Sequence, residues 1–392
     1  MTLTNAVPDR RLDLDWLRIA AFGLLIFYHV GMFYVTWGFH VKSSHASSAP
    51  EPFMLLLNPW RLTLLFVISG CATRFMLDKM KTGTFLGARS SRLLIPLVFG
   101  MFVIVPPQTY FELVEKLGYT GSFGEFYGKY ATASGGWPLA APTWNHLWFV
   151  IYLFVYTLLI AGIGPLLKRI PARIMAPLAK GLPIVLIPFL FLTLMRITLE
   201  PIFDETHALI DDWYAHAVYF PAFLFGYAIA KHEPFFEFCQ RIRWPMLVLA
   251  LTAWATLTTI RYGGFYTAEP SSPLLVIGPT LRELQAWTMI LALFGFARKH
   301  LRHDNAARRY LTDAIFPFYI IHQTTIVVAG HYLNQINLPV GMEAAILITA
   351  TAASCWLGYE LVRRVPVLRP LFGLKSNGTR KAARPDRQPA SA

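Results

Sequence analysis

The stretch LRIAAFGLLIFYH, residues 17–29, is apolar almost throughout, yet it carries Arg18 near its start and His29 at its end. The apolar residues continue on both sides and predict a membrane-spanning helix over 14–36, because a bilayer core takes about 20 apolar residues per helix. A helix turns by about 100° per residue, so eleven residues place Arg18 and His29 on one face, about 16 Å apart along the axis. We therefore expect one ionisable group at the mouth of this span and one deep inside it.

The rest of the chain repeats this apolar pattern. Its 392 residues are 55% hydrophobic and only 15% charged, whereas soluble domains carry about 25% charged residues. Apolar runs separated by short polar stretches predict an all-α, polytopic membrane helical bundle. We expect ten transmembrane helices, at 14–36, 54–77, 93–110, 146–167, 182–199, 214–230, 245–260, 278–297, 314–333 and 340–361.

The basic residues predict how this bundle is oriented. Most of the 35 Lys and Arg residues precede the first span, follow an even-numbered span or follow the last one; the other loops hold only Lys42, Lys116, Lys129 and Arg261. The positive-inside rule then places both termini in the cytoplasm. We expect a cytoplasmic segment at 1–13, a membrane domain at 14–365 and a basic, disordered cytoplasmic tail at 366–392. The net charge of +13 is then an orientation signal, and no nucleic-acid partner is expected because the basic residues form no motif.

Several polar residues inside the apolar runs have both a structural and a functional interpretation. Arg18 could snorkel to the headgroups or pair with Asp15, and it could also line a ligand path. His29 could hydrogen-bond a neighbouring helix or act as a general base. The same choice applies to the small pair Ser69–Gly70, to Arg89 and Arg92 at the start of the third span, to His146 in an aromatic belt, and to His322 and Gln323. The three cysteines indicate neither a disulfide nor a metal site.

Taken in order, these residues resemble the acyltransferase-3 superfamily of integral membrane acyltransferases. The resemblance rests on Arg18 and His29 in LDWLR…FYH, on FVISG at 66–70, on the R-x-x-R of Arg89 and Arg92, on HLWF at 146–149, and on the HQ pair His322–Gln323. The stretch WGFHVKSS, 37–44, is similar to the glucan-biosynthesis C-type members, which are associated with succinyl transfer to periplasmic glucans. The resemblance covers residues 10–365 and implies a multi-pass protein of the bacterial inner membrane.

The resemblance implies an O-acyltransferase that uses cytoplasmic acyl-CoA, succinyl-CoA or acetyl-CoA, and no metal. Arg89 and Arg92 would hold the nucleotide phosphates, with Arg18 lining the path and taking part in catalysis. His29 would deprotonate the hydroxyl of a glycan acceptor, or would itself carry the acyl group. Candidate substrate or oxyanion contacts are Ser69, His146, His322, Gln323 and His40. If the donor is succinyl-CoA, its second carboxylate needs a cation, for which Arg61, Arg74 and Arg282 are candidates. Proteins of glycan synthesis are expected partners.

Two other functions are compatible with the residues alone. Intramembrane Arg and His also mark ion pathways, so the main alternative is a proton-coupled transporter or exporter of a small molecule. The scarcity of acidic residues within the spans, with Glu283 and Glu360 among the few, disfavours it. A membrane scaffold or sensor without chemistry is the third possibility, and the depth of His29 argues against it.

Overall fold

The computed structural model describes residues 11–167, 181–265 and 272–375, and within these ranges it contains helices and no strands. The predicted all-α class is therefore confirmed. Most of the predicted N-terminal segment, 1–10, and most of the predicted tail, 376–392, lie outside the described residues. The first residues of that tail form α14, Leu368–Leu371, and Phe372 packs edge-on against Phe99 at a centroid distance of 5.3 Å.

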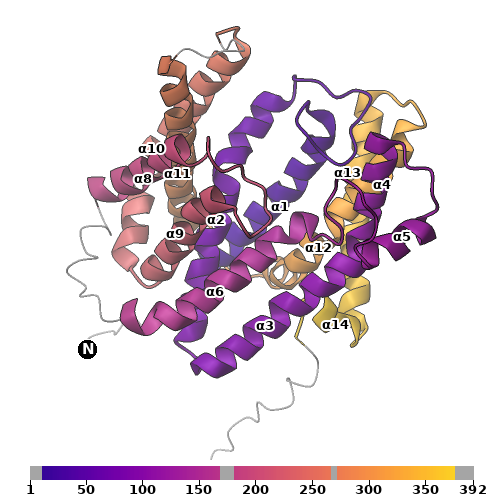
Figure 1. The fold of residues 1–392 in the computed structure, drawn as a ribbon. Coiled ribbons are helices and arrows are strands. Elements are labelled where there is room, and N and C mark those ends of the chain that lie inside the picture. The colour runs from indigo at the N-terminus through magenta and orange to yellow at the C-terminus, as the bar shows by residue number, and fades with distance from the viewer. Residues whose placement is uncertain (1–10, 168–180, 266–271, 376–392) are drawn as a thin grey trace, which may run out of the picture.

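The helices follow the predicted apolar runs closely (Figure 1). In chain order they are α1 (Leu12–Tyr34), α2 (Glu51–Leu77), α3 (Thr82–Phe99), the π-turn η1 (Gly100–Ile104), α4 (Pro106–Leu117), α5 (Phe123–Ala131), the short 3₁₀ turn η2 (Asn145–Leu147), α6 (Trp148–Leu167), α8 (Leu182–Thr198), α9 (Trp213–Ile229), α10 (Glu233–Tyr262), α11 (Ser272–His300), α12 (Ala306–Asn334), α13 (Val340–Arg364) and α14.

Six helices in the described ranges are long and apolar enough to cross a membrane: Leu12–Tyr34, Glu51–Leu77, Thr82–Ile104, Asn145–Gly164, Ala306–Asn334 and Val340–Arg364. The apolar helix Leu182–Thr198 is shorter. The other predicted spans coincide with α9, α10 and α11. The chain is therefore a membrane-embedded, multi-pass helical protein, while the count of ten spans and the cytoplasmic termini stay predictions.

The third predicted span, 93–110, is divided differently in the structure. A helix already begins at Thr82 and continues through the π-turn to Ile104, and α4 then starts at Pro106. The polar residues GARSS, 87–91, precede the predicted span, but they belong to the same helix as the apolar residues that follow. Pro106 and Pro107 open α4, where a missing backbone N–H costs nothing. Arg89 and Arg92 therefore lie well inside α3.

Helices α1 and α2 occupy the centre of the bundle, where α1 contacts α2, α11, α12 and α13 (Figure 1). Helix α2 packs most closely against α9. A Cβ added at Gly70 would lie 1.9 Å from the carbonyl oxygen of Phe223, and one at Gly226 would lie 1.9 Å from that of Val67. The two backbones can approach this closely only because both positions are glycine.

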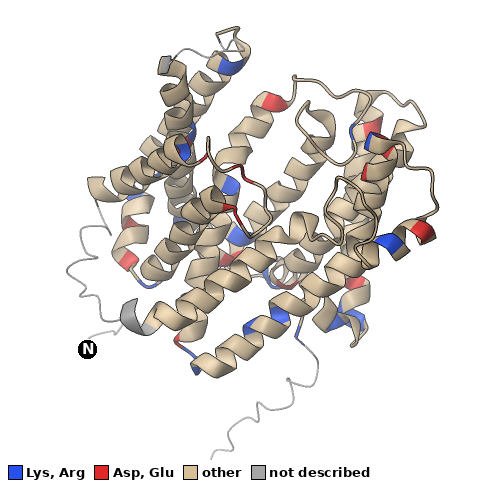
Figure 2. Cartoon of the chain, in the orientation of Figure 1, with Lys and Arg blue, Asp and Glu red and all other residues tan. Residues whose placement is uncertain are grey.

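Ion pairs tie together helix ends at one end of the bundle. Arg308 at the start of α12 contacts Asp15 in α1 at 2.7 Å, and Glu233 at the start of α10 contacts Arg298 at the end of α11 at 2.5 Å. Asp78, after α2, contacts Lys231, before α10, at 2.6 Å. These ends are the ones that the basic residues assign to a common side. Most of the remaining helical ribbon carries no charge (Figure 2).

Candidate active site

The site is built around a contact between two histidines from helices far apart in the sequence. His29 lies in α1 and His322 in α12, two helices that pack directly together. His29 Nδ1 lies 2.7 Å from His322 Nε2, and the two rings are stacked with centroids 5.0 Å apart. His322 Nδ1 in turn lies 2.7 Å from the carbonyl oxygen of Tyr319.

This chain of contacts decides which ring nitrogens carry protons when both rings are neutral. A carbonyl oxygen only accepts hydrogen bonds, so His322 Nδ1 donates to Tyr319. His322 Nε2 is then a lone-pair acceptor and receives the hydrogen bond from His29 Nδ1–H. His29 Nε2 is left without a proton, and His29 lines the large cavity of the protein. The arrangement therefore presents a basic nitrogen to that cavity.

A polar network extends from this pair towards the loops at the end of the bundle opposite to the ion-paired helix ends, which we call the outer loops. The ring of His146 lies edge-on to that of His322, with centroids 5.3 Å apart, and His146 Nδ1 accepts from Gln108 Nε2 at 3.3 Å. Gln323 Nε2 donates to Gln108 Oε1 at 3.1 Å and to His40 Nε2 at 3.0 Å. The structure therefore brings together five of the residues that the sequence singled out, and Gln108, which the sequence did not single out, joins His146 to Gln323.

The outer end of the network carries perturbed charged groups. His40 Nδ1 lies 2.5 Å from Glu112 Oε2, and Lys116 Nζ lies 2.6 Å from the other oxygen of the same carboxylate. Burial alone raises the pKa of Glu112, but hydrogen bonds and charges from His40 and Lys116 outweigh it and hold that pKa at about 2. Burial lowers the pKa of Lys42 to about 8, and its ammonium donates to the carbonyls of Met32 and Trp37.

The cavity has a volume of about 720 Å³ and lies between the central helices and the outer loops. A space of this size lies within the range of small-molecule sites. Its walls combine aromatic side chains with charged ones, unlike the purely apolar packing of a bundle core. They include His29, His40, Asn58, Arg61, Trp144, His146, Arg196, Tyr219, Arg282, Glu283 and Gln323.

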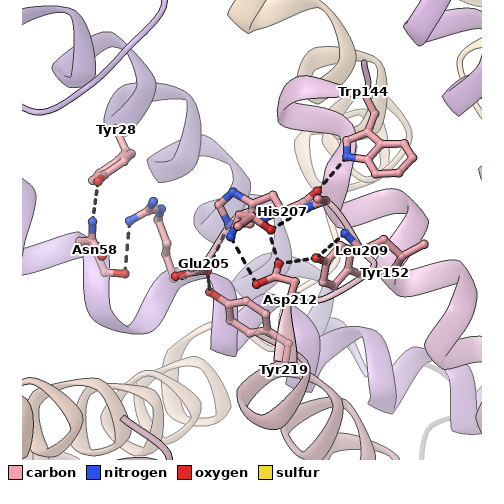
Figure 3. A network of polar contacts seen from close by, with 12 residues as sticks. Tyr28, Asn58, Trp144, Tyr152, Glu205, His207, Leu209, Asp212 and Tyr219 are labelled. Atoms are coloured by element: carbon pink, nitrogen blue, oxygen red, sulfur yellow. Dashed lines mark hydrogen bonds and ion pairs between the residues drawn. The ribbon is translucent and has the colours of Figure 1, made fainter. Parts of the chain in front are cut away.

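A loop between α8 and α9 lines one side of this cavity, and Figure 3 shows the polar contacts of this loop. The carboxylate of Asp212 accepts hydrogen bonds from the Tyr152 hydroxyl and, at 2.9 Å, from the backbone N–H of His207. Trp144 Nε1 donates to the carbonyl of His207 at 2.9 Å, and the ring of His207 stacks on Trp148 at 3.9 Å. These contacts hold the loop against α6.

Glu205 in this loop is a fixed carboxylate at the cavity wall. It accepts from the Tyr219 hydroxyl at 2.5 Å and contacts His207 Nε2 at 3.1 Å. Burial raises the pKa of Glu205, but His207 and Tyr219 outweigh it and hold the pKa at about 2. Glu205 therefore remains ionised and hydrogen-bonded at any physiological pH.

Two arginines of the cavity wall converge on Asn58 in α2. Arg282 Nη2 donates to Asn58 Oδ1 at 2.7 Å, and Arg61 Nη1 donates to the Asn58 carbonyl at 3.2 Å. The amide of Asn58 donates to the Tyr28 hydroxyl at 2.6 Å, as Figure 3 shows. The Arg61 guanidinium lies over the Tyr28 ring, 3.4 Å from its centroid. Tyr28 precedes His29, so this cluster adjoins the histidine pair.

The residues expected to hold the donor lie near the other end of α1. Arg18 lies 3.7 Å from Asp15, as in the pairing considered from the sequence. Both residues line a small pocket of about 120 Å³ between α1 and α2. Arg89 is buried and donates to Thr73 Oγ1 at 2.7 Å. The charges of Arg18 and Arg92 both act on Arg89. Three arginines of the prediction are therefore grouped, although only Arg18 lines the pocket.

Phe22 in α1 belongs to a buried aromatic cluster. It lies between Arg18 and His29 on the shared face of α1, because positions four and seven residues apart are neighbours on a helix. Its ring packs edge-on against Phe149 and Tyr319, with centroid distances of 6.1 and 5.4 Å. A molecule that reached from Arg18 to His29 would pass this aromatic cluster.

Of the predicted substrate or oxyanion residues, Ser69 and His322 do not line the cavity, but His322 contacts His29, which does. Gly70, the neighbour of Ser69, is buried in the contact between α2 and α9. The small residue Gly70 therefore allows close contact between two helices, which is the structural interpretation of the Ser69–Gly70 pair. In the part of the chain that the structure describes, no three His, Cys, Asp or Glu side chains are placed to hold one metal ion.

Sequence reasoning missed Gln108, Asn58 and the carbonyl of Tyr319. Gln108 follows Pro106–Pro107 at the end of an apolar run, where an amide looks like a helix-start residue. Asn58 precedes Pro59 inside α2, and this proline was the available sequence signal. Proline has no backbone N–H, so the carbonyl four residues before it lacks its helical hydrogen bond and is free for a side chain. Gln285 Nε2 donates to that carbonyl, of Leu55, at 2.9 Å. No sequence pattern marks a backbone carbonyl as a histidine partner.

Comparison with known proteins supplies the family context. The sequence model of the acyltransferase-3 family, described as an acyltransferase domain, matches residues 11–360. The chain is 26% identical to glucans biosynthesis protein C of Shigella dysenteriae serotype 1 (strain Sd197), over 95% of this chain and 96% of that protein. It is 25% identical, over the same shares, to glucans biosynthesis protein C of Escherichia coli (strain K12). No solved structure matches the chain at a significant level.

Proposed function

Because the chain belongs to the acyltransferase-3 family, we propose that this membrane acyltransferase moves an acyl group from cytoplasmic acyl-CoA to a hydroxyl of an extracytoplasmic glycan. A periplasmic glucan is the proposed acceptor class, since the relatives named above are glucans biosynthesis proteins. The acyl group is succinyl or acetyl, and the proposed location is the bacterial inner membrane. Proteins of glycan synthesis are the proposed partners.

One observation carries the proposal: His29 is oriented by His322, and His322 by the carbonyl of Tyr319. A general base needs a defined tautomer and an accessible lone pair, and an orienting hydrogen bond on the other ring nitrogen supplies both. His29 lines a cavity whose volume accommodates a sugar residue. A histidine that served only to join two helices would have no need of this open side.

The proposed reaction takes place at His29 Nε2. The acceptor hydroxyl gives its proton to this nitrogen, and the acceptor oxygen bonds to the thioester carbonyl carbon, whose C=O electron pair moves onto the carbonyl oxygen. When the carbonyl re-forms, the carbon–sulfur bond breaks. The departing coenzyme A thiolate then takes the proton back from His29, so that free coenzyme A and an acylated glycan result. His322 accepts a hydrogen bond from His29 throughout and keeps the ring in place.

The donor end is proposed to be the arginine group of Arg18, Arg89 and Arg92. Nucleotide phosphates suit guanidinium groups because these donate paired hydrogen bonds. Arg18 lies on the same face of α1 as His29, about 16 Å away, so the pantetheine arm would span this distance and the Phe22 side chain would turn aside to admit it. His40 and Gln323, at the outer mouth, are proposed to contact the acceptor.

Mass spectrometry of periplasmic and surface glycans tests this function. Cells that produce the wild-type protein, His29→Ala or no protein are compared, with His303→Gln, an exposed loop residue, as the control variant. We expect a mass increment of one succinyl or acetyl group with wild type and His303→Gln only. Equal acylation in His29→Ala cells would make His29 structural. Glycans that do not differ even in the deletion would favour the transporter alternative.

A further inference from the structure

The residues predicted from the sequence to donate a hydrogen bond to the thioester oxygen either make hydrogen bonds within the protein already or do not line the cavity. His146 Nε2 donates to the Ile320 carbonyl at 3.1 Å, and His322 Nδ1 donates to the Tyr319 carbonyl. Both amide hydrogens of Gln323 are engaged, as described above. Ser69 does not line the cavity. The negative charge that acyl transfer creates near His29 therefore needs another partner.

Arg61 is a buried cation with unspent hydrogen-bonding capacity in the same cavity. It is only 7% exposed, and its Nε has no hydrogen-bond partner among the described residues. The carboxylates of the cavity wall are paired elsewhere: Glu283 contacts Arg196, and Glu205 contacts His207. Within the described ranges Arg61 makes no ion pair. A charge buried in this way is costly unless it meets an opposite charge, so it marks a site for an anion.

The position of Arg61 relates it directly to the base. Its guanidinium carbon lies 3.4 Å from the centroid of the Tyr28 ring, and that ring lies 6.1 Å from the His29 ring between centroids. The distance from the guanidinium carbon of Arg61 to the centroid of the His29 ring therefore cannot exceed the sum of these two distances. Asn58, itself held by Arg282, accepts a hydrogen bond from Arg61 Nη1 through its backbone carbonyl, and Arg61 lines the cavity.

We propose that Arg61 is a catalytic residue that pairs with the oxyanion formed on the thioester carbonyl during acyl transfer; this inference rests on the proposed function. As the acceptor oxygen bonds to the carbonyl carbon and its proton passes to His29, the C=O electron pair becomes a full charge on oxygen, which Arg61 meets. The charge returns to the re-formed carbonyl when the carbon–sulfur bond breaks. A preformed cation in a site screened from water stabilises such a charge more than the neutral ground state.

Steady-state coenzyme A release by the full chain in nanodiscs tests this role. Wild type, Arg61→Gln, Arg61→Lys and the control Arg243→Gln are each measured with acetyl-CoA and with succinyl-CoA. The acceptor is the unacylated form of the glucan that the earlier experiment identifies. Arg243 is an arginine of α10 that lines neither cavity. We expect Arg61→Gln to lower kcat by about 100- to 1,000-fold with both donors, with little change in KM, and Arg61→Lys to recover part of the loss. If the glutamine variant does not fold, Arg61→Met, which keeps the alkyl chain over Tyr28, replaces it, and the same loss of kcat is expected.

Two results would overturn the role. A rise in KM confined to succinyl-CoA, with acetyl transfer intact, would mean that Arg61 binds the second carboxylate of the acyl group. A kcat within twofold of wild type would mean that Arg61 takes no part in the reaction. If the wild-type protein itself releases no coenzyme A with either donor, the proposed acyl transfer is what fails, which distinguishes that failure from one confined to Arg61.

Discussion

The side chains of His40 and Glu112 meet at 2.5 Å at the outer mouth of the cavity, although 72 residues separate them in the sequence. This contact and Lys116 hold the pKa of Glu112 at about 2 despite its burial, whereas an unfolded glutamate titrates near 4.3. The carboxylate therefore stabilises the fold at pH values above about 4.3, and this contribution is lost as the pH falls towards about 2.

The first prediction follows from the stabilising effect of ionised Glu112. Glu112→Gln should lower the free energy of unfolding by on the order of 2 kcal/mol at pH 7, after allowance for solvent screening, and by progressively less below pH 4. Thermal unfolding in detergent at several pH values measures the difference, with Glu237→Gln, a more exposed carboxylate, as the control. A difference that stays constant from pH 7 to pH 3 would contradict the assignment.

His322 should act as a positioning residue for His29. Removing its ring in His322→Phe should lower kcat by about 100-fold or more, because the hydrogen bond that fixes the His29 tautomer is lost. His322→Gln should retain more activity, since a glutamine oxygen can accept from His29 Nδ1. Steady-state kinetics of both variants, with unfolding temperatures for comparison, check this. Equal losses in the two variants would show that His322 fills space and does not orient the base.

The donor end makes a separate kinetic prediction. Arg18→Gln and Arg89→Gln should each raise KM for acyl-CoA by about 10-fold or more, because a hydrogen bond to a charged phosphate contributes about 1.5–3 kcal/mol. The value of kcat should change little, since Arg18 lies about 16 Å along α1 from His29. Arg364→Gln, at the exposed end of α13, is the matched control. An unchanged KM in both variants would mean that the nucleotide binds elsewhere.

The contact between α2 and α9 predicts a stability effect without a kinetic one. Gly70→Ala should destabilise the protein by about 2 kcal/mol or more, because the added carbon would lie 1.9 Å from a backbone carbonyl oxygen that cannot move aside. Gly162→Ala is the control, since nothing lies within 4 Å of the carbon it would add. Thermal unfolding of both variants in detergent gives the comparison. Similar unfolding temperatures for the two variants would refute the close helix contact.

The sequence was sufficient for the fold class and for the position of α1. Apolar runs are long in a membrane protein, so every predicted span except 93–110 coincides with one helix. The spacing of Arg18 and His29 needed only one continuous helix, Leu12–Tyr34. Boundaries were weaker where polar residues lie within a helix. GARSS lies before the predicted third span but belongs to α3, because membrane helices continue beyond the apolar core.

The site could be predicted only residue by residue, without its connections. His29 and His322 were both singled out, but their contact joins helices 293 residues apart, and one sequence carries no signal of such pairing. The network also depends on Gln108 and on the carbonyl of Tyr319, whose roles arise from packing alone. Arg61 was recognised as an intramembrane charge. Its place beside Tyr28 became visible only when α1 and α2 were seen together.

The most direct measurement uses the purified protein in sealed vesicles, with acyl-CoA on the side of the basic helix ends and glucan on the other side. The account predicts that coenzyme A is released on the first side and acylated glucan accumulates on the second, at equal rates. His29→Ala should abolish both and His303→Gln neither. Acylated glucan formed at the wild-type rate by a folded His29→Ala protein would contradict the central claim that His29 is the base of the transfer.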